Sequence, residues 1–257
     1  MTGKVHIGSV LSRTFETYGS QFTLLIPAAF VVFLPIAILT GLAVAASPLA
    51  GVLVLAVLGA LGSVLYQGMV VEAAADMLDG RRNQTIGSLL GGAAPVVVPL
   101  LLAGILVGLA TALGLFLLIV GAFLVATIFA VTAPAIVIER LGAIDGMKRS
   151  VDLVKHQFLP ALGVLVVVLL INYVAGYVLQ LIFGAIDDGV LGYSLGSLIS
   201  QVLLAPITAL AASYLYFDLS GYRGPVGGEP GQLGGQPGQV TPQPGAARPA
   251  GGPPPAV

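Results

Sequence analysis

The chain alternates between long apolar runs and short polar segments, and this pattern predicts its architecture. The apolar runs cover residues 22–46, 49–71, 96–138, 159–183 and 197–217. A helix rises about 1.5 Å per residue, so roughly 20 residues cross a hydrocarbon core about 30 Å thick. The run 96–138 has no charged residue and would measure about 65 Å as one straight helix, so we divide it into two spans that turn near residues 117–121. The sequence therefore predicts six transmembrane helices.

Three shorter segments have the pattern of helices that lie flat on a membrane surface. They cover about residues 4–18, 85–92 and 143–156. In the last of them Ile144, Met147 and Val151 recur at three- and four-residue spacing, and charged side chains fill the remaining arc. Each segment precedes a pair of spans. We therefore expect an all-α polytopic membrane bundle of six transmembrane helices in three hairpins, each hairpin preceded by a cytoplasmic interfacial amphipathic helix.

Local signals place some helix ends and bends. Thr85 can cap the second surface helix, and the pair Gly91-Gly92 should end it. Pro27 and Pro35 lie inside the first span, and Pro206 lies inside the last. We expect these prolines to bend their helices without ending them, because neighbouring helices in a bundle can satisfy the freed carbonyls.

The order of elements repeats three times: a surface helix, an outward span, an inward span, and an acidic residue at the inner end. The three copies run from Ile7-Gly8-Ser9 to Glu72, from Ile86-Gly87-Ser88 to Glu139, and from Ala143-Ile144-Asp145 to Asp218. This order favours duplication of a helix-plus-hairpin unit. In such a bundle we expect Arg13 and Arg149 on the surface helices to reach acidic side chains at the span ends. The acidic candidates are Glu72, Asp76, Glu139 and Asp218.

Composition supports a lipid environment and excludes several function classes. The chain is 57% hydrophobic and 8% charged, whereas about 25% of the residues of a soluble domain are charged. A net charge of −1 with only 10 Lys and Arg residues excludes a broadly basic nucleic-acid binder. The absence of Cys removes disulfides and thiolate chemistry. The bilayer itself is therefore the first partner that we expect.

The distribution of basic residues predicts the orientation. In a six-span protein all of them fall on one side: Lys4, Arg13, Arg81, Arg82, Arg140, Lys148, Arg149, Lys155, Arg223 and Arg248. By the positive-inside rule, both termini are then cytoplasmic. From Gly224 onward 19 of 34 residues are Gly or Pro, so we divide the chain into a membrane domain, residues 1–222, and a disordered cytoplasmic tail, residues 223–257.

Three short motifs resemble a known family. They are Glu139-Arg140 at the end of the fourth span, Lys148-Arg149-Ser150 on the following surface helix, and Tyr216-Phe217-Asp218-Leu219 at the end of the last span. Over about residues 5–222 the chain resembles the glycerophosphoryl diester phosphodiesterase membrane domain family of largely uncharacterised bacterial proteins. The resemblance implies a multi-pass protein of the bacterial plasma membrane. The family is named from members fused to a phosphodiesterase barrel, and these 257 residues contain no such barrel, so the resemblance does not imply hydrolysis.

Candidate chemistry is sparse. The two histidines, His6 and His156, lie on different surface helices, whereas a metal-assisted hydrolase would need several His and carboxylate ligands at one cavity. We therefore expect no enzyme and no cofactor. Glu72, Asp76 and Asp79 share one helix face and can form a cation or proton site, but we favour the simpler interpretation that they are the hydrated end of a span.

The remaining candidates are interior amides and surface cations. Gln67, Asn172 and Gln201 either join helices or line a pathway. Arg140, Lys148 and Arg149 can bind anionic lipid headgroups or acidic span ends.

These features leave three functional hypotheses. We favour a non-enzymatic structural or lipid-associated module, with a homo-oligomer or another membrane protein as a further partner. The alternatives are a small transporter or permease-like subunit built around the three amides, and an accessory domain for a separate lipid-headgroup phosphodiesterase. A transporter predicts a polar cavity that touches several of these amides, whereas a structural module predicts a dry centre packed by Gly and Leu.

Overall fold

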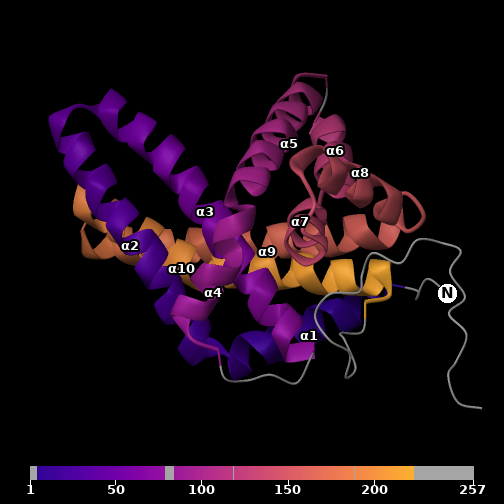
Figure 1. Ribbon diagram of the computed structural model, residues 1–257. Helices are drawn as coiled ribbons and strands as arrows, with labels where there is room; N and C mark the ends of the chain where they lie inside the picture. Colours follow the sequence, from indigo (N-terminus) through magenta and orange to yellow (C-terminus); the bar gives the residue numbers. More distant parts are fainter. Residues whose placement is uncertain (1–4, 79–83, 118, 188, 223–257) are drawn as a thin grey trace, which may run out of the picture. The chain divides into compact units, whose positions relative to one another are not determined.

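The computed structural model describes residues 5–78, 84–117, 119–187 and 189–222, although the side chains of residues 115–117, 119, 120 and 190 are not described. Within these ranges every regular element is a helix (Figure 1). In chain order they are α1 (Ile7–Ser20), α2 (Phe22–Ala46), α3 (Pro48–Leu78), α4 (Ile86–Ala93), the 3-10 turn η1 (Ala94–Val96), α5 (Val97–Leu117), α6 (Ile119–Ile128), α7 (Thr132–Glu139), α8 (Ala143–Val154), α9 (Phe158–Ile186) and α10 (Val190–Ser220). The predicted all-helical fold is confirmed.

Six stretches are long and apolar enough to cross a membrane, as predicted. They are Phe22–Ala46, Pro48–Leu78, Ile86–Gly114, Gly121–Glu139, Phe158–Ile186 and Leu191–Ser220. Their outer faces carry large apolar side chains that no protein group covers; for example, Leu49 is 69% exposed and Ile105 57% exposed. Soluble proteins rarely expose apolar surface on this scale. These are the features of a multi-pass integral membrane protein.

The turn between the third and fourth spans falls where the sequence predicts it. Helix α5 ends at Leu117 and α6 begins at Ile119, and Leu118 lies outside the described residues. Beside this turn the two backbones meet at a pair of glycines: a Cβ added to Gly114 would lie 2.8 Å from the carbonyl carbon of Gly121. Only glycine permits such a close approach.

Two local predictions about helix ends have different outcomes. Thr85 does cap α4: its Oγ1 accepts a hydrogen bond from the Ser88 amide at 3.2 Å, and Ser88 Oγ accepts one from the Thr85 amide at 3.0 Å. The prediction that Gly91 and Gly92 end this helix is wrong, because α4 continues through both to Ala93 and leads through η1 into α5. Pro95, which has no amide hydrogen to donate, lies where the α-helical pattern stops.

The fourth span contains a break that the sequence analysis did not predict. Helix α6 ends at Ile128 and α7 begins at Thr132, which places Pro134 in the first turn of α7, where a missing amide hydrogen costs nothing. The hydroxyl of Ser150 on α8 donates to the Ile128 carbonyl at 2.8 Å and so satisfies a carbonyl at the break. In contrast, α2 continues through Pro27 and Pro35, and α10 through Pro206, as expected.

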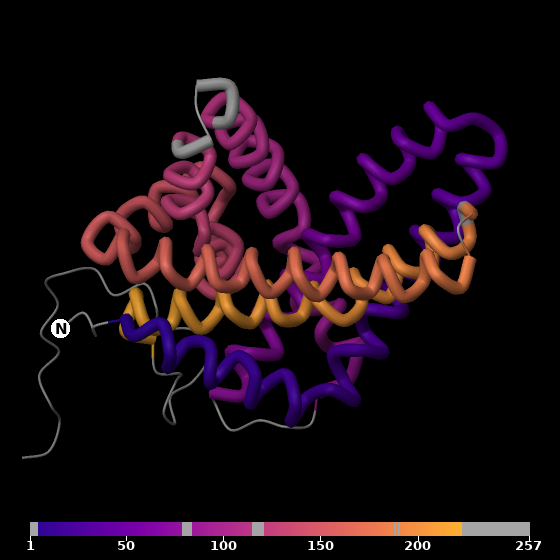
Figure 2. Tube along the Cα trace, turned by 180° about the vertical axis from the view of Figure 1, so that it is seen from behind, coloured from indigo at the N-terminus to yellow at the C-terminus, as the bar shows by residue number. Residues whose placement is uncertain are grey.

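Consecutive spans pack together. The most extensive helix contacts are those of α2 with α3, α9 with α10, and α5 with α6; the pair α9 and α10 is seen side by side in Figure 2. The three short helices that precede the span pairs, α1, α4 and α8, pack in a different way. Helix α4 packs on α3, α8 packs on α7, and α1 packs on α10. Each short helix therefore lies against the second span of a pair that is not its own.

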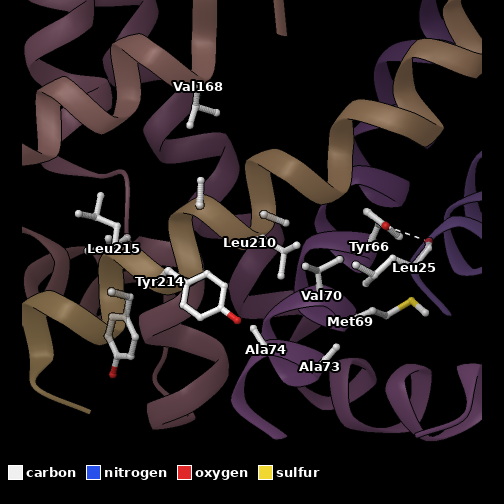
Figure 3. Close-up of a cluster of buried hydrophobic side chains, with 14 of the residues drawn as sticks. Leu25, Tyr66, Met69, Val70, Ala73, Ala74, Val168, Leu210, Tyr214 and Leu215 are labelled. Carbon is white, nitrogen blue, oxygen red and sulfur yellow. Dashed lines mark hydrogen bonds between the residues drawn. The ribbon is translucent and has the colours of Figure 1, made fainter. Parts of the chain in front are cut away.

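The buried core lies where α3 meets α10 and α2 (Figure 3). Tyr66, Met69 and Val70 of α3 pack with Leu210 and other residues of α10, and all four are at most 1% exposed. The Tyr66 hydroxyl donates to the Leu25 carbonyl of α2 at 3.0 Å, which satisfies a polar group within an otherwise apolar cluster. Close packing here fixes the rotation of α3 and α10, and with it the direction of the side chains on their other faces.

Candidate functional site

A cavity of about 440 Å³ lies between α2, α3, α9 and α10. It brings together all three interior amides that the sequence analysis singled out, Gln67, Asn172 and Gln201. Four further polar side chains line it: Ser63, Tyr66, Ser200 and Thr208. The rest of the wall is formed by Phe33 and by aliphatic and small residues. None of the described residues that line the cavity is charged at neutral pH.

Helical spacing explains why these side chains share one space. Ser63 and Gln67 are four residues apart on α3 and so lie on the same face. On α10, Ser200, Leu204 and Thr208 follow each other at four-residue intervals, and Gln201 is beside the first. Asn172 lies at the midpoint of α9, fourteen residues from each end, or about 21 Å at 1.5 Å per residue.

The polar groups of the cavity are only partly satisfied by the protein. Asn172 donates from Nδ2 to the Val168 carbonyl at 2.8 Å and accepts at Oδ1 from the Thr208 hydroxyl at 3.3 Å. The Ser200 hydroxyl is buried without a hydrogen-bond partner. Among the described residues, the side chains of Gln67 and Gln201 form no hydrogen bond with another protein group. The lining therefore holds donors and acceptors that a bound molecule can use.

The cavity is partly open. Ser63 and Thr208, on α3 and α10, are exposed, whereas Tyr66 is buried. The rings of Phe33 and Tyr66 lie 5.4 Å apart, centroid to centroid, and are tilted by 56°. The site therefore combines a hydrogen-bonding wall with an aromatic one.

A second set of polar contacts joins the ends of three spans. Arg13 of α1 binds both carboxylate oxygens of Asp218 on α10 at 2.5 Å. Arg149 of α8 donates from Nε to Glu139 on α7 at 2.7 Å. The prediction that Arg13 and Arg149 reach acidic span ends is confirmed by these contacts. Each acidic side chain is only 21–26% exposed, so these pairs are better shielded from solvent than ordinary surface ion pairs.

The third pair has a different geometry. Arg140 donates from Nη2 to Glu72 of α3 at 2.6 Å and from Nη1 to the Gly92 carbonyl of α4 at 2.9 Å. Arg13 and Arg149 are the seventh residues of α1 and α8, and Gly92 is the seventh residue of α4. The seventh position of α4 is therefore a glycine, whereas the same position of α1 and of α8 is an arginine. The guanidinium that binds Glu72 comes instead from Arg140, which follows α7. Of the two kinds of partner that the sequence allows for Arg140, anionic headgroups and acidic span ends, the structure has the second, Glu72.

Arg140 occupies an unusual backbone conformation. Its φ is 52°, the one positive φ found for a non-glycine residue in the described part of the chain, and it caps the end of α7. A side chain in this region costs about 1–2 kcal/mol. The two hydrogen bonds to α3 and α4 offset that strain, because the left-handed turn directs the guanidinium away from α7 and towards its partners.

Glu139 is shared between two donors. Its Oε1 accepts from Arg149 and, at 2.6 Å, from the Tyr216 hydroxyl of α10. Burial alone would lower the pKa of Arg149, but the hydrogen bond and the charge of Glu139 outweigh it and raise that pKa above its ordinary value. Together with Arg140 and Glu72, these contacts link the C-terminal ends of α3, α7 and α10.

The remaining predicted charges are Lys148, Asp76 and Asp79. Lys148 is 72% exposed and lies 3.5 Å from Asp145 on its own helix. Asp76 is half-buried one turn beyond Glu72 on α3, and Asp79 lies outside the described residues. The sequence analysis missed Ser63, Ser200 and Thr208. Ser63 is four residues before Gln67 on α3, and Thr208 is eight residues after Ser200 on α10, so helical spacing was the signal that could have revealed them.

Comparison of the chain with protein-family models, with curated proteins and with solved structures finds no match. Its function must therefore be argued from the cavity and the contacts around it.

Proposed function

We propose that this membrane protein is a permease-like module that admits a small polar molecule to the cavity between α2, α3, α9 and α10. The observation that carries the proposal is the convergence of Gln67, Asn172 and Gln201 on one space. Amides that only join helices would bond to each other or to a neighbouring backbone, because an unpaired polar group in the bilayer is costly. Gln67 and Gln201 form no such bonds among the described residues.

This proposal reverses the order in which the sequence ranked the hypotheses. The structural hypothesis required a dry centre packed by Gly and Leu, whereas the transporter hypothesis required a polar cavity touching several amides. The cavity found here fits the second requirement. We propose no catalytic role: the lining holds hydroxyls and carboxamides, which bind and orient a molecule but are not the acids and bases that hydrolysis uses.

Cysteine accessibility tests whether the cavity is reached from water. The chain has no native Cys, so single-cysteine variants of the full chain need no further change. Ser200→Cys places a thiol in the cavity. Val174→Cys is the matched control, because Val174 is two residues from Asn172 on the opposite face of α9 and is 51% exposed. The thiolate, which forms only in contact with water, attacks the thiosulfonate sulfur, so that a mixed disulfide forms and a sulfinate leaves.

In nanodiscs, a small water-soluble thiosulfonate should modify the S200C variant at least about tenfold faster than the V174C variant, the separation expected when one thiolate is hydrated and the other is in lipid. Equal and slow rates at both positions would show that the cavity is closed to water, and the permease-like function would then be wrong.

A second candidate function, association with anionic lipid, is supported by α8. Lys148 and Lys155 are 72% and 51% exposed in their side chains. Each cation near an anionic surface contributes about 1 kcal/mol, or roughly fivefold in affinity. The variant Lys148→Glu should therefore weaken binding of the protein to anionic lipid in mixed nanodiscs, as read by native mass spectrometry. If the variant retains the same number of bound anionic lipids as the wild type, the exposed lysines do not bind these lipids.

We also propose that the membrane is a bacterial plasma membrane and that both termini are cytoplasmic. The basic residues that are described, Arg13, Arg140, Lys148, Arg149 and Lys155, belong to α1, α8 and the adjoining turns. The others, Lys4, Arg81, Arg82, Arg223 and Arg248, and the predicted disordered tail lie outside the described residues. The positive-inside rule then gives the orientation.

The family resemblance and the internal duplication remain proposals, and the contacts at the span ends support both. The residues of the three family motifs interact: Glu139 binds Arg149 and Tyr216, while Arg140 and Asp218 each close a further ion pair. The short helices each pack on the second span of another unit in one cyclic order. We propose that three helix-plus-hairpin units of a membrane module assemble in this way.

A further inference from the structure

The ligand class of the cavity can be narrowed further, on the basis of the permease-like function proposed above. We infer that the cavity binds an uncharged polyhydroxyl group, such as a linear polyol or a single sugar ring. Three properties of the lining lead to this assignment: its lack of charge, its mixture of donors and acceptors, and its aromatic wall.

The lack of charge excludes ions as the preferred ligand. Among the residues that the structure describes, no Asp, Glu, Lys, Arg or His lines the cavity, and Asn172 is at the middle of a helix that is long and apolar enough to cross the membrane. A full charge at such a place would lose its hydration without gaining an opposite charge. An uncharged ligand gives up only hydrogen bonds with water, which the lining can replace.

The hydrogen-bonding groups suit hydroxyls in particular. A carboxamide offers both an acceptor oxygen and a donor NH₂ group, and each protein hydroxyl both donates and accepts. In the described part of the chain, Gln67 and Gln201 keep such groups without a protein partner, and so does the buried Ser200 hydroxyl. A ligand hydroxyl also donates and accepts, so a chain of hydroxyls can satisfy several of these groups at once. A ligand with acceptors alone would leave the amide oxygens of Gln67 and Gln201 without a donor.

The rest of the lining fits the carbon skeleton of such a ligand. Phe33 and Tyr66 line the cavity at its buried side, at 3% and 1% exposure, and Leu204 and Ala205 add apolar surface against which C–H groups can pack. The volume of about 440 Å³ is roughly that of 15 waters at ~30 Å³ each, and is within the range of about 300–1,000 Å³ of small-molecule sites. It therefore accommodates a monosaccharide-sized group.

The polyhydroxyl group can come from two sources, a free solute or the headgroup of a neutral glycolipid. The cavity is partly open beside the exposed residues Ser63 and Thr208, and either source presents the same hydroxyls to the lining. Both sources are tested separately below.

Protection of the S200C variant from thiosulfonate modification measures ligand class directly. Sorbitol and glucose should slow modification, whereas gluconate and glucosamine, which carry a negative and a positive charge at similar size, should not. The free-solute source predicts protection by sugar added in buffer. The lipid source predicts protection in nanodiscs that contain a monoglucosyl diacylglycerol, compared with nanodiscs that lack it.

Loss of one amide should weaken protection. In the S200C background, Gln201→Leu should raise the polyol concentration needed for half protection by about fivefold, the effect of one typical hydrogen bond. Gln180→Leu is the matched control, because Gln180 is a glutamine of α9 that does not line the cavity, and it should leave that concentration unchanged. Circular dichroism and gel filtration establish that each variant is folded.

The outcomes separate this assignment from the function on which it rests. Equal protection by gluconate or glucosamine would overturn the ligand class while leaving a water-filled cavity. Modification of S200C that neither free polyols nor the glycolipid slows would also overturn it. A failure of S200C to react at all would instead contradict the permease-like function itself.

Discussion

Removal of Arg13 should destabilise the protein more than removal of an ordinary surface cation. Arg13 binds both oxygens of Asp218 and lies with its guanidinium carbon 5.3 Å from the centre of the Tyr214 ring. The Asp218 side chain is 21% exposed, so the Arg13→Ala variant leaves a half-buried carboxylate without its cation. Exposed pairs contribute about 0–1 kcal/mol, and breaking a buried pair costs about 3–5 kcal/mol. We therefore expect a loss of about 2 kcal/mol.

A pair on α8 provides the control. Lys148 and Asp145 are 3.5 Å apart, with side chains 72% and 68% exposed, so Lys148→Ala should cost less than about 0.5 kcal/mol. The assay is equilibrium unfolding in mixed micelles of dodecyl maltoside and dodecyl sulfate, followed by circular dichroism. A double-mutant cycle with Asp218→Ala isolates the coupling between Arg13 and Asp218, which should be about 1–2 kcal/mol. A coupling of zero, or equal losses for R13A and K148A, would refute the role given to this ion pair.

Three further predictions test other parts of the structure. Gly114→Ala should cost about 1–3 kcal/mol, since its Cβ would lie 2.8 Å from the Gly121 backbone, whereas Gly108→Ala, with nothing within 4 Å, should be neutral or stabilising; equal thermal melts would mean that the helices do not meet there. Arg140→Gly should be about 1 kcal/mol less destabilising than Arg140→Ala in the same micelle assay, because glycine tolerates a φ of 52°; the opposite order would argue against a strained turn. Reporter fusions after Ala46 should score extracytoplasmic and after Lys155 cytoplasmic, and an inverted result would contradict the orientation.

Much of the architecture could be predicted because it depends on local properties of the chain. The length and apolarity of the runs were enough to give six spans, and a 43-residue run without charge had to turn near its middle. The Thr85 cap could be predicted because it depends only on neighbouring residues. The charges of Arg13 and Arg149 on surface helices, together with acidic residues at the span ends, were also enough to indicate acidic partners.

The features that could not be predicted depend on tertiary contacts. The break between α6 and α7 needs the Ser150 hydroxyl from another helix, and the pairing of Arg140 with Glu72 needs a left-handed backbone turn. The sequence identified Gln67, Asn172 and Gln201 as polar residues within spans. Whether they face one another depends on the rotation of α3, α9 and α10, which is set by packing around residues such as Tyr66 and Leu210. The sequence therefore allows both a polar cavity and a dry centre, and only the packing decides between them.

The central claim is that polar molecules enter the bilayer region of this protein through the amide-lined cavity, and efflux from proteoliposomes tests it most directly. Vesicles that contain the full chain would be loaded with radiolabelled sorbitol, diluted, and followed over time beside vesicles that contain the Q67L/Q201L double variant. The account predicts that sorbitol leaves the wild-type vesicles faster than those with the double variant, which should behave like protein-free vesicles. Identical efflux from wild-type and double-variant vesicles would contradict it.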